Sequence, residues 1–339
     1  MMRRIVARAP GKLFLLGEYA VLDGCPAVVA AVDRFIEVTL DISDTHRRTR
    51  IRSGTAELEF PTAAPPEDTG MWRFVGAAFC SSLREHPALA ERGFNIEIVS
   101  HLGAHRGVKV GLGSSAAVTV GLMAAMAAAA GQRLTERARR DTLFAAALDA
   151  HRRAQRELGS GADVAASTYG GVILFQPRNG SPEISPLRLP ADTQFLAAWT
   201  GEPASTTDLV NSYRRDDNGR GAARATFVEA SRHSVKEFVT TLAQGALSLS
   251  AVLQNGALLE QLTADLSLPL LTPRLRRIVA IARAHGAAAK ISGAGGGDCG
   301  IALTRDAAAA RGIRADWQAA GLLPLDLNIC DEGVTVVDG

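Results

Sequence analysis

The strongest constraint in this chain is the stretch GLGSSAA at residues 111–117, which leads directly into an alanine-rich apolar run ending at Gly131. The run predicts a buried helix, and the stretch predicts where that helix begins. The first N–H groups of a helix have no partner inside it, and the helix dipole adds positive charge at the same end. We therefore predict that this helix N-terminus binds a phosphate.

Each residue type in the stretch suits such a site. The two glycines let the backbone approach an anion and adopt positive φ, the serines add hydroxyl donors, and the two alanines keep the first helical turn small. Ser115 is also a candidate ligand for a Mg²⁺ that bridges phosphates. The predicted phosphate-binding residues are Lys109, Gly111, Leu112, Gly113, Ser114, Ser115, Ala116 and Ala117.

The stretch is open to two other interpretations. A serine after glycine is also an ordinary helix N-cap. The spacing from Gly111 to Ala116 matches the dinucleotide fingerprint as well, but that motif needs a strand and an acidic residue after the helix. Here residues 132–158 again have a helical pattern, which argues against a nicotinamide site. The chain also lacks the GxxxxGK[ST] pattern of a P-loop.

The remaining patterns predict two α+β domains. Apolar and polar residues alternate over 36–42, which is typical of a half-buried strand. The proline-rich segment 177–190 is the predicted boundary, so the domains are 1–185 and 186–339. Further strands are expected at 5–9, 13–16, 94–98, 171–176, 195–200 and 299–304, helices at 71–86, 115–130, 135–158, between 220 and 287 and at 305–320, and a last hairpin around 325–337.

Composition narrows the class of protein. The chain has 37 basic and 35 acidic residues, and this balance argues against a nucleic-acid binder. The apolar run is shorter than the ~20 residues that a membrane span needs, and the N-terminus lacks the apolar core of a signal peptide. The four cysteines show no CxxC spacing, as expected for thiols in a reducing compartment. We expect a cytoplasmic protein that binds neither nucleic acid nor membrane.

Three other segments carry candidate site residues. APGKLFLLGEYAVLDG at 9–24 contains Lys12 at the start of a strand and Glu18 in the turn that follows. GSGADVAASTYGG at 159–171 contains Asp163 just after a predicted helix. KISGAGGGDCGIAL at 290–303 is a second glycine cluster, which brings bare backbone close to a neighbour and predicts a wall beside a nucleotide.

With GLGSSAA, these segments resemble the GHMP kinase superfamily, the small-molecule kinases of galactose, homoserine, mevalonate and phosphomevalonate. PGKLFLLGEY, GLGSSAA and KISGAGGGD are similar to its three signature motifs, in the same order. The resemblance implies an N-terminal ribosomal-protein-S5-domain-2-like domain with a left-handed βαβ crossover, a C-terminal ferredoxin-like domain, and ATP between them. The segments 150–171, 199–210 and 295–303 are most similar to the phosphomevalonate kinase branch.

The resemblance also implies roles. The loop would bind the β- and γ-phosphates of ATP, Ser115 the Mg²⁺, and Lys12 and Asp163 would be the catalytic pair. A glutamate that completes the metal site in mevalonate kinases is replaced here by Arg152. A phosphorylated acceptor is mostly dianionic at pH 7 and needs no proton removed. We therefore predict that Lys12 supplies the electrostatic stabilisation while Asp163 chiefly orients Lys12.

An anionic acceptor needs polar side chains of its own to bind it. Helix-cap and buried-core roles compete with this interpretation for several residues, notably Ser205, Thr206 and His151. The candidate substrate-binding residues are Glu18, Tyr19, His151, Gln155, Ser160, Gly161, Ser205, Thr206, Ser231, Gly295, Gly296 and Asp298.

The expected reaction is transfer of the γ-phosphoryl group of ATP to 5-phosphomevalonate, giving 5-diphosphomevalonate in the mevalonate route to isoprenoids. The alternatives are a mevalonate kinase that phosphorylates the 5-hydroxyl of mevalonate, a sugar-1-kinase of the same superfamily, and a non-catalytic ATP sensor. The expected partners are ATP, Mg²⁺ and the small-molecule acceptor, in a monomer or homodimer.

Overall fold

A long antiparallel hairpin of two strands lies at the centre of the fold. The structure is a computed structural model that describes residues 3–66, 70–105, 108–215 and 220–338. Strand β1 (Arg3–Leu16) pairs with β2 (Ala27–Ser43) along nearly its whole length, with a register shift between Pro10 and Gly11. The two strands expected at 5–9 and 13–16 are therefore one strand with a bulge at Pro10–Gly11, which absorbs the irregularity that the proline introduces.

The larger sheet has the order β14-β1-β2-β5-β3-β4, and β2 also pairs with β8, which pairs with β9. The other strands of this sheet are β3 (Arg48–Ser53), β4 (Ala56–Pro61), β5 (Gly93–Ser100), β8 (Val172–Gln176), β9 (Glu183–Leu187) and β14 (Thr335–Asp338). A two-residue ribbon, β6 (Ala104–His105) with β7 (Val108–Lys109), precedes the glycine loop.

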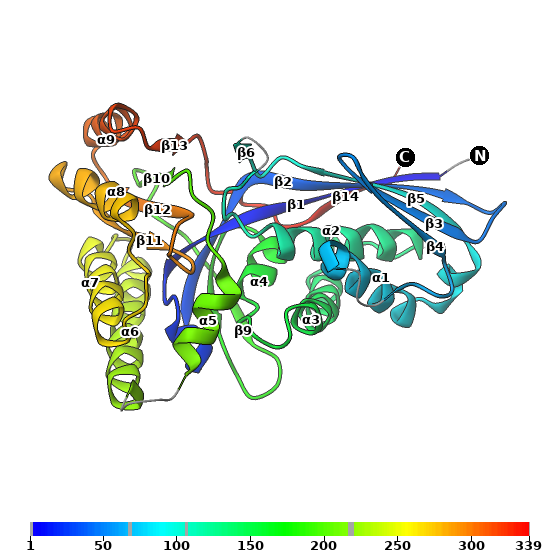
Figure 1. Ribbon diagram of the computed structural model, residues 1–339, viewed down its shortest axis with the longest axis horizontal. Helices are drawn as coiled ribbons and strands as arrows, with labels where there is room; N and C mark the ends of the chain where they lie inside the picture. Colours follow the sequence, from blue (N-terminus) through cyan, green and yellow to red (C-terminus); the bar gives the residue numbers. More distant parts are fainter. Residues whose placement is uncertain (1–2, 67–69, 106–107, 216–219, 339) are drawn as a thin grey trace.

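Four helices cover one face of this sheet (Figure 1). They are α1 (Arg73–Glu85), α2 (Ser114–Ala129), α3 (Arg137–Ala154) and α4 (Ala162–Tyr169), with short 3₁₀ turns η1 (Ala20–Asp23), η2 (Gly70–Trp72) and η3 (Pro87–Glu91). Helix α2 contacts β1 and β2 on one side and α1, α3 and α4 on the others. A helix enclosed on every side must be apolar all round, which explains its alanine-rich sequence.

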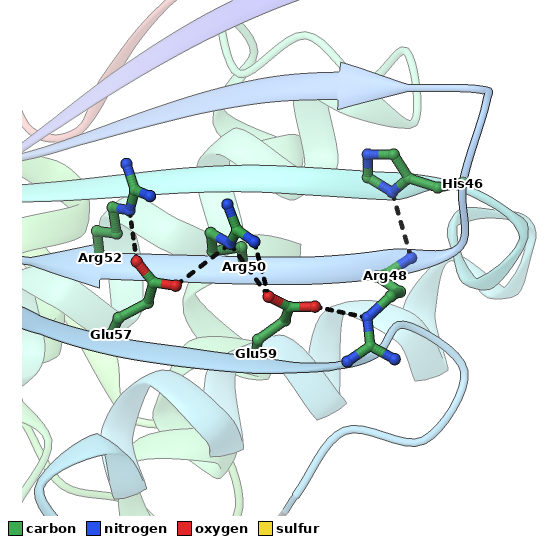
Figure 2. Close-up of polar contacts among 6 residues, drawn as sticks. All are labelled: His46, Arg48, Arg50, Arg52, Glu57 and Glu59. Atoms are coloured by element: carbon green, nitrogen blue, oxygen red, sulfur yellow. Dashed lines mark hydrogen bonds and ion pairs between the residues drawn. The ribbon is translucent and has the colours of Figure 1, made fainter.

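Over strands β3 and β4 the opposite face of the sheet is polar and exposed. In the hairpin β3–β4 the arginines of one strand face the glutamates of the other, as Figure 2 shows. Arg50 Nη2 lies 2.9 Å from Glu59 Oε2, and Arg52 Nε lies 2.7 Å from Glu57 Oε2. Exposed pairs of this kind add little stability. They do place charge along the edge strand β4, which hinders its pairing with another chain.

The second sheet is antiparallel, with the order β11-β12-β10-β13, and it packs against helices α7, α8 and α9. Its elements are β10 (Gln194–Trp199), α5 (Thr206–Arg214), α6 (Arg220–Ala243), α7 (Leu249–Asp265), α8 (Pro273–Ala284), β11 (Ala288–Ser292), β12 (Cys299–Thr304), α9 (Ala307–Ala319) and β13 (Leu323–Leu325). Helix α5 lies between the two halves of the molecule (Figure 1).

The path of the chain differs from the prediction at the C-terminus and bears on the predicted domain division. The last hairpin expected around 325–337 is wrong, because β13 pairs with β10 in the second sheet while β14 pairs with β1 in the first. The C-terminal segment therefore returns to the N-terminal half. The division predicted between residues 185 and 186 lies inside β9, which still pairs with β8 of the first sheet, and the division stays a prediction.

The packing around α2 generates a stability prediction. Ala124 is fully buried in the centre of α2, so a larger side chain there must displace its neighbours. We expect Ala124→Leu to lower the free energy of unfolding by about 1–3 kcal/mol. The matched control is Ala315→Leu at an exposed position of α9. Thermal unfolding followed by circular dichroism checks this, and an equal melting temperature for the two variants would contradict the packing argument.

Candidate active site

One pocket of about 520 Å³ is bounded by segments that lie far apart in the sequence. Strand β1 and its turn, the glycine loop, the α3–α4 connection, the start of α5 and the β11–β12 turn all contribute to its wall. It therefore contains residues from both halves of the molecule. The predicted site residues that line it are Lys12, Glu18, Tyr19, Lys109, Gly111, Gly113, Ser114, Ser115, Gln155, Ser160, Asp163, Ser205, Thr206 and Asp298.

The glycine loop enters α2 in the left-handed backbone conformation. Gly113 is the N-cap residue with φ 80°, and no side chain caps the helix, so the serines are not N-caps but occupy the first helical turn. A Cβ on Gly113 would lie 3.0 Å from Lys12 Cγ, and one on Gly111 would lie 2.4 Å from Asp298 Cγ. Leu112, Ala116 and Ala117 are buried behind the loop. The helix start thus presents unpaired N–H groups to the pocket.

Lys12 lies on β1 directly beside this loop. Its N–H donates to the carbonyl oxygen of Leu112 at 2.9 Å, and its Nζ lies 5.3 Å from the centre of the Phe14 ring. Only 9% of the residue is exposed. Among the described residues Lys12 has no ion-pair partner within 4 Å. Its charge is therefore available for a ligand in the pocket.

Asp163 lies in the first turn of α4 rather than just after a helix, because the chain bends at Gly161 (φ 87°) and starts a new helix. Its Oδ1 accepts a hydrogen bond from the N–H of Val164 at 2.9 Å. Its Oδ2 lies 4.0 Å from Nε2 of His151, and the described ion pairs include none between Asp163 and Lys12. The carboxylate therefore faces the Ser115 side of the pocket.

His151 does not line the pocket but supports it from behind. The ring is 1% exposed, it stacks on Phe74 with centroids 5.0 Å apart, and its Nε2 lies 3.2 Å from Ser115 Oγ. Burial lowers the pKa of His151, and the nearby carboxylate of Asp163 offsets this only in part. A neutral imidazole in this place orients the hydroxyl of Ser115.

The third glycine motif joins the second sheet to the pocket. The N–H of Asp298 donates to the carbonyl of Glu202 at 2.8 Å, and its Oδ1 accepts from the N–H of Ala204 at 3.2 Å. Burial raises the pKa of Asp298, while the hydrogen bond from Ala204 and the charge of Lys12 act in the opposite direction. Gly295 and Gly296 have positive φ and form the turn without lining the pocket. Asp298 thus fixes the segment that leads into α5.

The acceptor-side candidates are only partly brought together. Ser205 lines the pocket and is also the N-cap of α5, accepting from the N–H of Asp208 at 3.4 Å. Thr206 begins that helix, and Gln155 and Ser160 lie across the α3–α4 connection. Ser231 does not belong to this wall, because it is buried on α6 and accepts from Nδ2 of Asn255 on α7 at 3.3 Å.

A buried ion pair beneath the first motif was missed. Lys290 is fully buried on β11, donates to the carboxylate of Glu18 and to the carbonyl of Ile291 at 2.8 Å, and burial lowers its pKa. Tyr19 Oη donates to the carbonyl of Ala294 at 2.5 Å. These contacts fasten the first motif to the third. The signal was present in the sequence as a lysine within an otherwise apolar strand, because a buried charge requires a partner.

Arg73 and Phe74 were also missed. Both line the pocket from the start of α1, and the Arg73 guanidinium lies 4.9 Å from the centre of the Phe74 ring. Their segment carries no motif, so the sequence offered no signal for them.

The buried ion pair generates a second stability prediction. Lys290→Met leaves the Glu18 carboxylate buried without its partner, which typically costs about 3–5 kcal/mol. We expect urea denaturation to show a loss of that size. The double variant Glu18→Gln with Lys290→Met removes both charges and should be more stable than Lys290→Met alone. A double variant as unstable as the single one would show that packing, and not charge pairing, matters here.

Comparisons with known proteins identify the family of this chain. Residues 73–171 match the GHMP kinases N-terminal domain, and residues 244–322 match the GHMP kinases C-terminal model. A phosphomevalonate kinase of Streptomyces sp. (strain CL190) is 37% identical and is aligned over 98% of this chain and 99% of its own. A mevalonate kinase of Aeropyrum pernix is 28% identical over 93% of each chain.

A solved structure has the same fold. The Streptococcus pneumoniae phosphomevalonate kinase in complex with phosphomevalonate and AMPPNP superposes with a TM-score of 0.79 at 24% identity, covering 96% of this chain and 99% of that one. The expected α+β fold with two GHMP kinase domains is confirmed. With both domain models matched and a relative 37% identical along almost its entire length, the chain belongs to the GHMP kinase family of ATP-using phosphotransferases.

Proposed function

We propose that this protein transfers the γ-phosphoryl group of ATP to 5-phosphomevalonate, giving 5-diphosphomevalonate. One observation carries the proposal: a single pocket holds the N-terminus of α2, the ammonium of Lys12, which has no ion-pair partner within 4 Å among the described residues, and a separate hydroxyl-rich wall. The Streptomyces relative that is 37% identical is a phosphomevalonate kinase, whereas the mevalonate kinase relative is 28% identical. The higher identity to the phosphomevalonate kinase favours a phosphorylated acceptor.

The start of α2 is the proposed site of the ATP phosphates. Gly111 and Gly113 let the loop pack closely against Asp298 and Lys12, where a Cβ would collide, and the N–H groups of the first turn are not capped by any side chain. Ser114 and Ser115 line the pocket from that turn, and Lys109 lies before it. Amides and hydroxyls in this arrangement are suited to a triphosphate at a helix N-terminus.

The residues present fit a Mg²⁺ that takes few protein ligands. The hydroxyl of Ser115 lines the pocket with its Oγ 3.2 Å from His151 Nε2, and it supplies one oxygen donor for the ion. Hard oxygen donors are those that Mg²⁺ prefers, and the remaining ligands are commonly waters and substrate phosphates. Bound there, the ion would neutralise charge on the phosphates. Arg152 instead lies with its Nη2 3.5 Å from the carbonyl of Ser160 and offers no ligand.

Lys12 is the proposed electrostatic centre of the reaction. Its ammonium has no carboxylate partner among the described residues and borders both the glycine loop and Gly293 of the third motif. A phosphomonoester acceptor is mostly ionised at pH 7, so its oxygen attacks without losing a proton. The main barrier is then the repulsion between two anions, which a buried cation lowers.

The proposed acceptor wall comprises the hydroxyls of Ser160, Ser205 and Thr206 with Gln155 and Tyr19. Because Ser205 is the N-cap of α5 and lines the pocket, the N-terminus of that helix also lies at the pocket.

All four cysteines are free thiols, and we place the enzyme in the cytoplasm on this basis. Within the described residues no helix is long and apolar enough to cross a membrane. The monomeric or homodimeric state stays a prediction.

The choice of acceptor is tested by a coupled assay of ADP release with phosphomevalonate and with mevalonate. We expect kcat/KM to be much higher for phosphomevalonate, since an ionised acceptor needs no general base. Equal or higher kcat/KM for mevalonate would instead establish the mevalonate kinase alternative. Absence of turnover with either acceptor would favour the ATP sensor.

The division of roles between the two candidate catalytic residues is tested by substitution. We expect Lys12→Ala to lower kcat on the order of 10²–10³-fold, the range typical for loss of one preorganised electrostatic group. Asp163→Asn keeps the shape of the side chain and should cost clearly less if Asp163 only orients neighbouring groups. Steady-state kinetics at saturating ATP measures both. A loss for Asp163→Asn as large as that for Lys12→Ala would show that Asp163 acts directly.

A further inference from the structure

Arg73 lines the same pocket as Lys12 and Lys109, at the first residue of α1. No hydrogen bond or ion pair engages its guanidinium within the described part of the chain. None of the three acidic residues in the pocket wall is paired with Arg73, because Glu18 is paired with Lys290, Asp163 lies beside His151 and Asp298 accepts from Ala204. The guanidinium therefore has donors available for an anionic ligand.

The side chain is held in place by stacked rings. The guanidinium lies 4.9 Å from the centre of the Phe74 ring, and that ring stacks on His151 at 5.0 Å with an angle of 28°. His151 in turn contacts Ser115 Oγ. A continuous series of contacts thus links the first turn of α2 to Arg73. A cation resting on an aromatic face is preorganised while the N–H groups along its edge stay accessible.

A second hollow, of about 330 Å³, has Arg73 in its wall as well. Its other basic residues are Arg84, Arg153 and Arg156. Arg153 is paired with Asp149, so the hollow is not a fixed anion site by itself, but its arginines raise the local positive potential. Arg73 stands where this basic hollow meets the pocket, which favours the approach of a phosphorylated molecule from that side.

We propose that Arg73 binds the phosphoryl group of the phosphorylated acceptor, through two parallel N–H···O bonds. A guanidinium matches a phosphate in this way, whereas an ammonium acts as a point charge. The acceptor is favoured over ATP because the ATP phosphates already have the amides of α2. Arg73 instead belongs to the wall that includes Gln155 and Ser160. The inference deepens the proposed function and rests on it.

The experiment measures the binding of each ligand, separately from turnover. Isothermal titration gives the Kd of phosphomevalonate, and of ATP with Mg²⁺, for the wild type, Arg73→Gln and Arg73→Lys. We expect Arg73→Gln to raise the Kd of phosphomevalonate about 10- to 100-fold, the usual effect of losing a charge-assisted hydrogen bond. Its Kd for ATP should stay within about twofold. Arg73→Lys keeps the charge but cannot make two parallel hydrogen bonds, so its Kd for phosphomevalonate should lie between those of the wild type and Arg73→Gln.

The control is Arg277→Gln, which removes an exposed arginine of α8 that lines neither hollow and should bind both ligands like the wild type. Melting temperatures show whether each variant is folded. An unchanged Kd for phosphomevalonate in folded Arg73→Gln, or a rise in the Kd of ATP alone, would overturn the inference. A wild type that binds phosphomevalonate without phosphorylating it would instead overturn the proposed function and leave the assignment of Arg73 intact.

Discussion

The site depends on one close backbone contact, between β1 and the glycine loop. The N–H of Lys12 donates to the carbonyl of Leu112, and a Cβ on Gly11 would lie 2.8 Å from that same oxygen. Because Gly11 and Gly113 lack side chains, the strand and the helix start come close enough to put the lysine ammonium beside the unpaired amides of α2. The ammonium and the amides thereby line the same pocket, where both can contact one anion.

The pocket also needs its two halves to be held in register, and buried polar contacts do this. Lys290 and Glu18 join β11 to the turn after β1, while Asp298 joins the third motif to the segment before α5. The Lys290–Glu18 pair is buried and the Asp298–Ala204 contact is partly buried, so loss of either would leave a poorly solvated charge or donor. The pocket wall is therefore stabilised by the same groups that specify how the sheets meet. Rigid placement of this kind is what phosphoryl transfer requires, since the protein's contribution is chiefly positioning and electrostatic stabilisation.

Much of the site was predictable because its residues belong to short contiguous motifs. The glycine loop and Ser115 follow from glycines and serines at fixed spacing, Lys12 follows from the resemblance of its segment to a family motif, and the enclosed helix α2 follows from its uniformly apolar composition. Ser231 and His151 were harder to place. Each is a polar residue on a helix, and the sequence does not state which face of that helix meets the pocket. Packing places Ser231 against Asn255 and His151 behind Ser115.

The sequence by itself determined the family, and it predicted a phosphate site at the N-terminus of α2 from residue types a few positions apart, whereas the role of Lys12 was predicted from the resemblance of its segment to a family motif. Only the tertiary structure decided the partner of Glu18, the sheet to which β14 returns, and the presence of Arg73 in the wall. Those features join residues that are hundreds of positions apart or that carry no motif. Their proximity follows from how the sheets and helices pack, which local patterns do not encode.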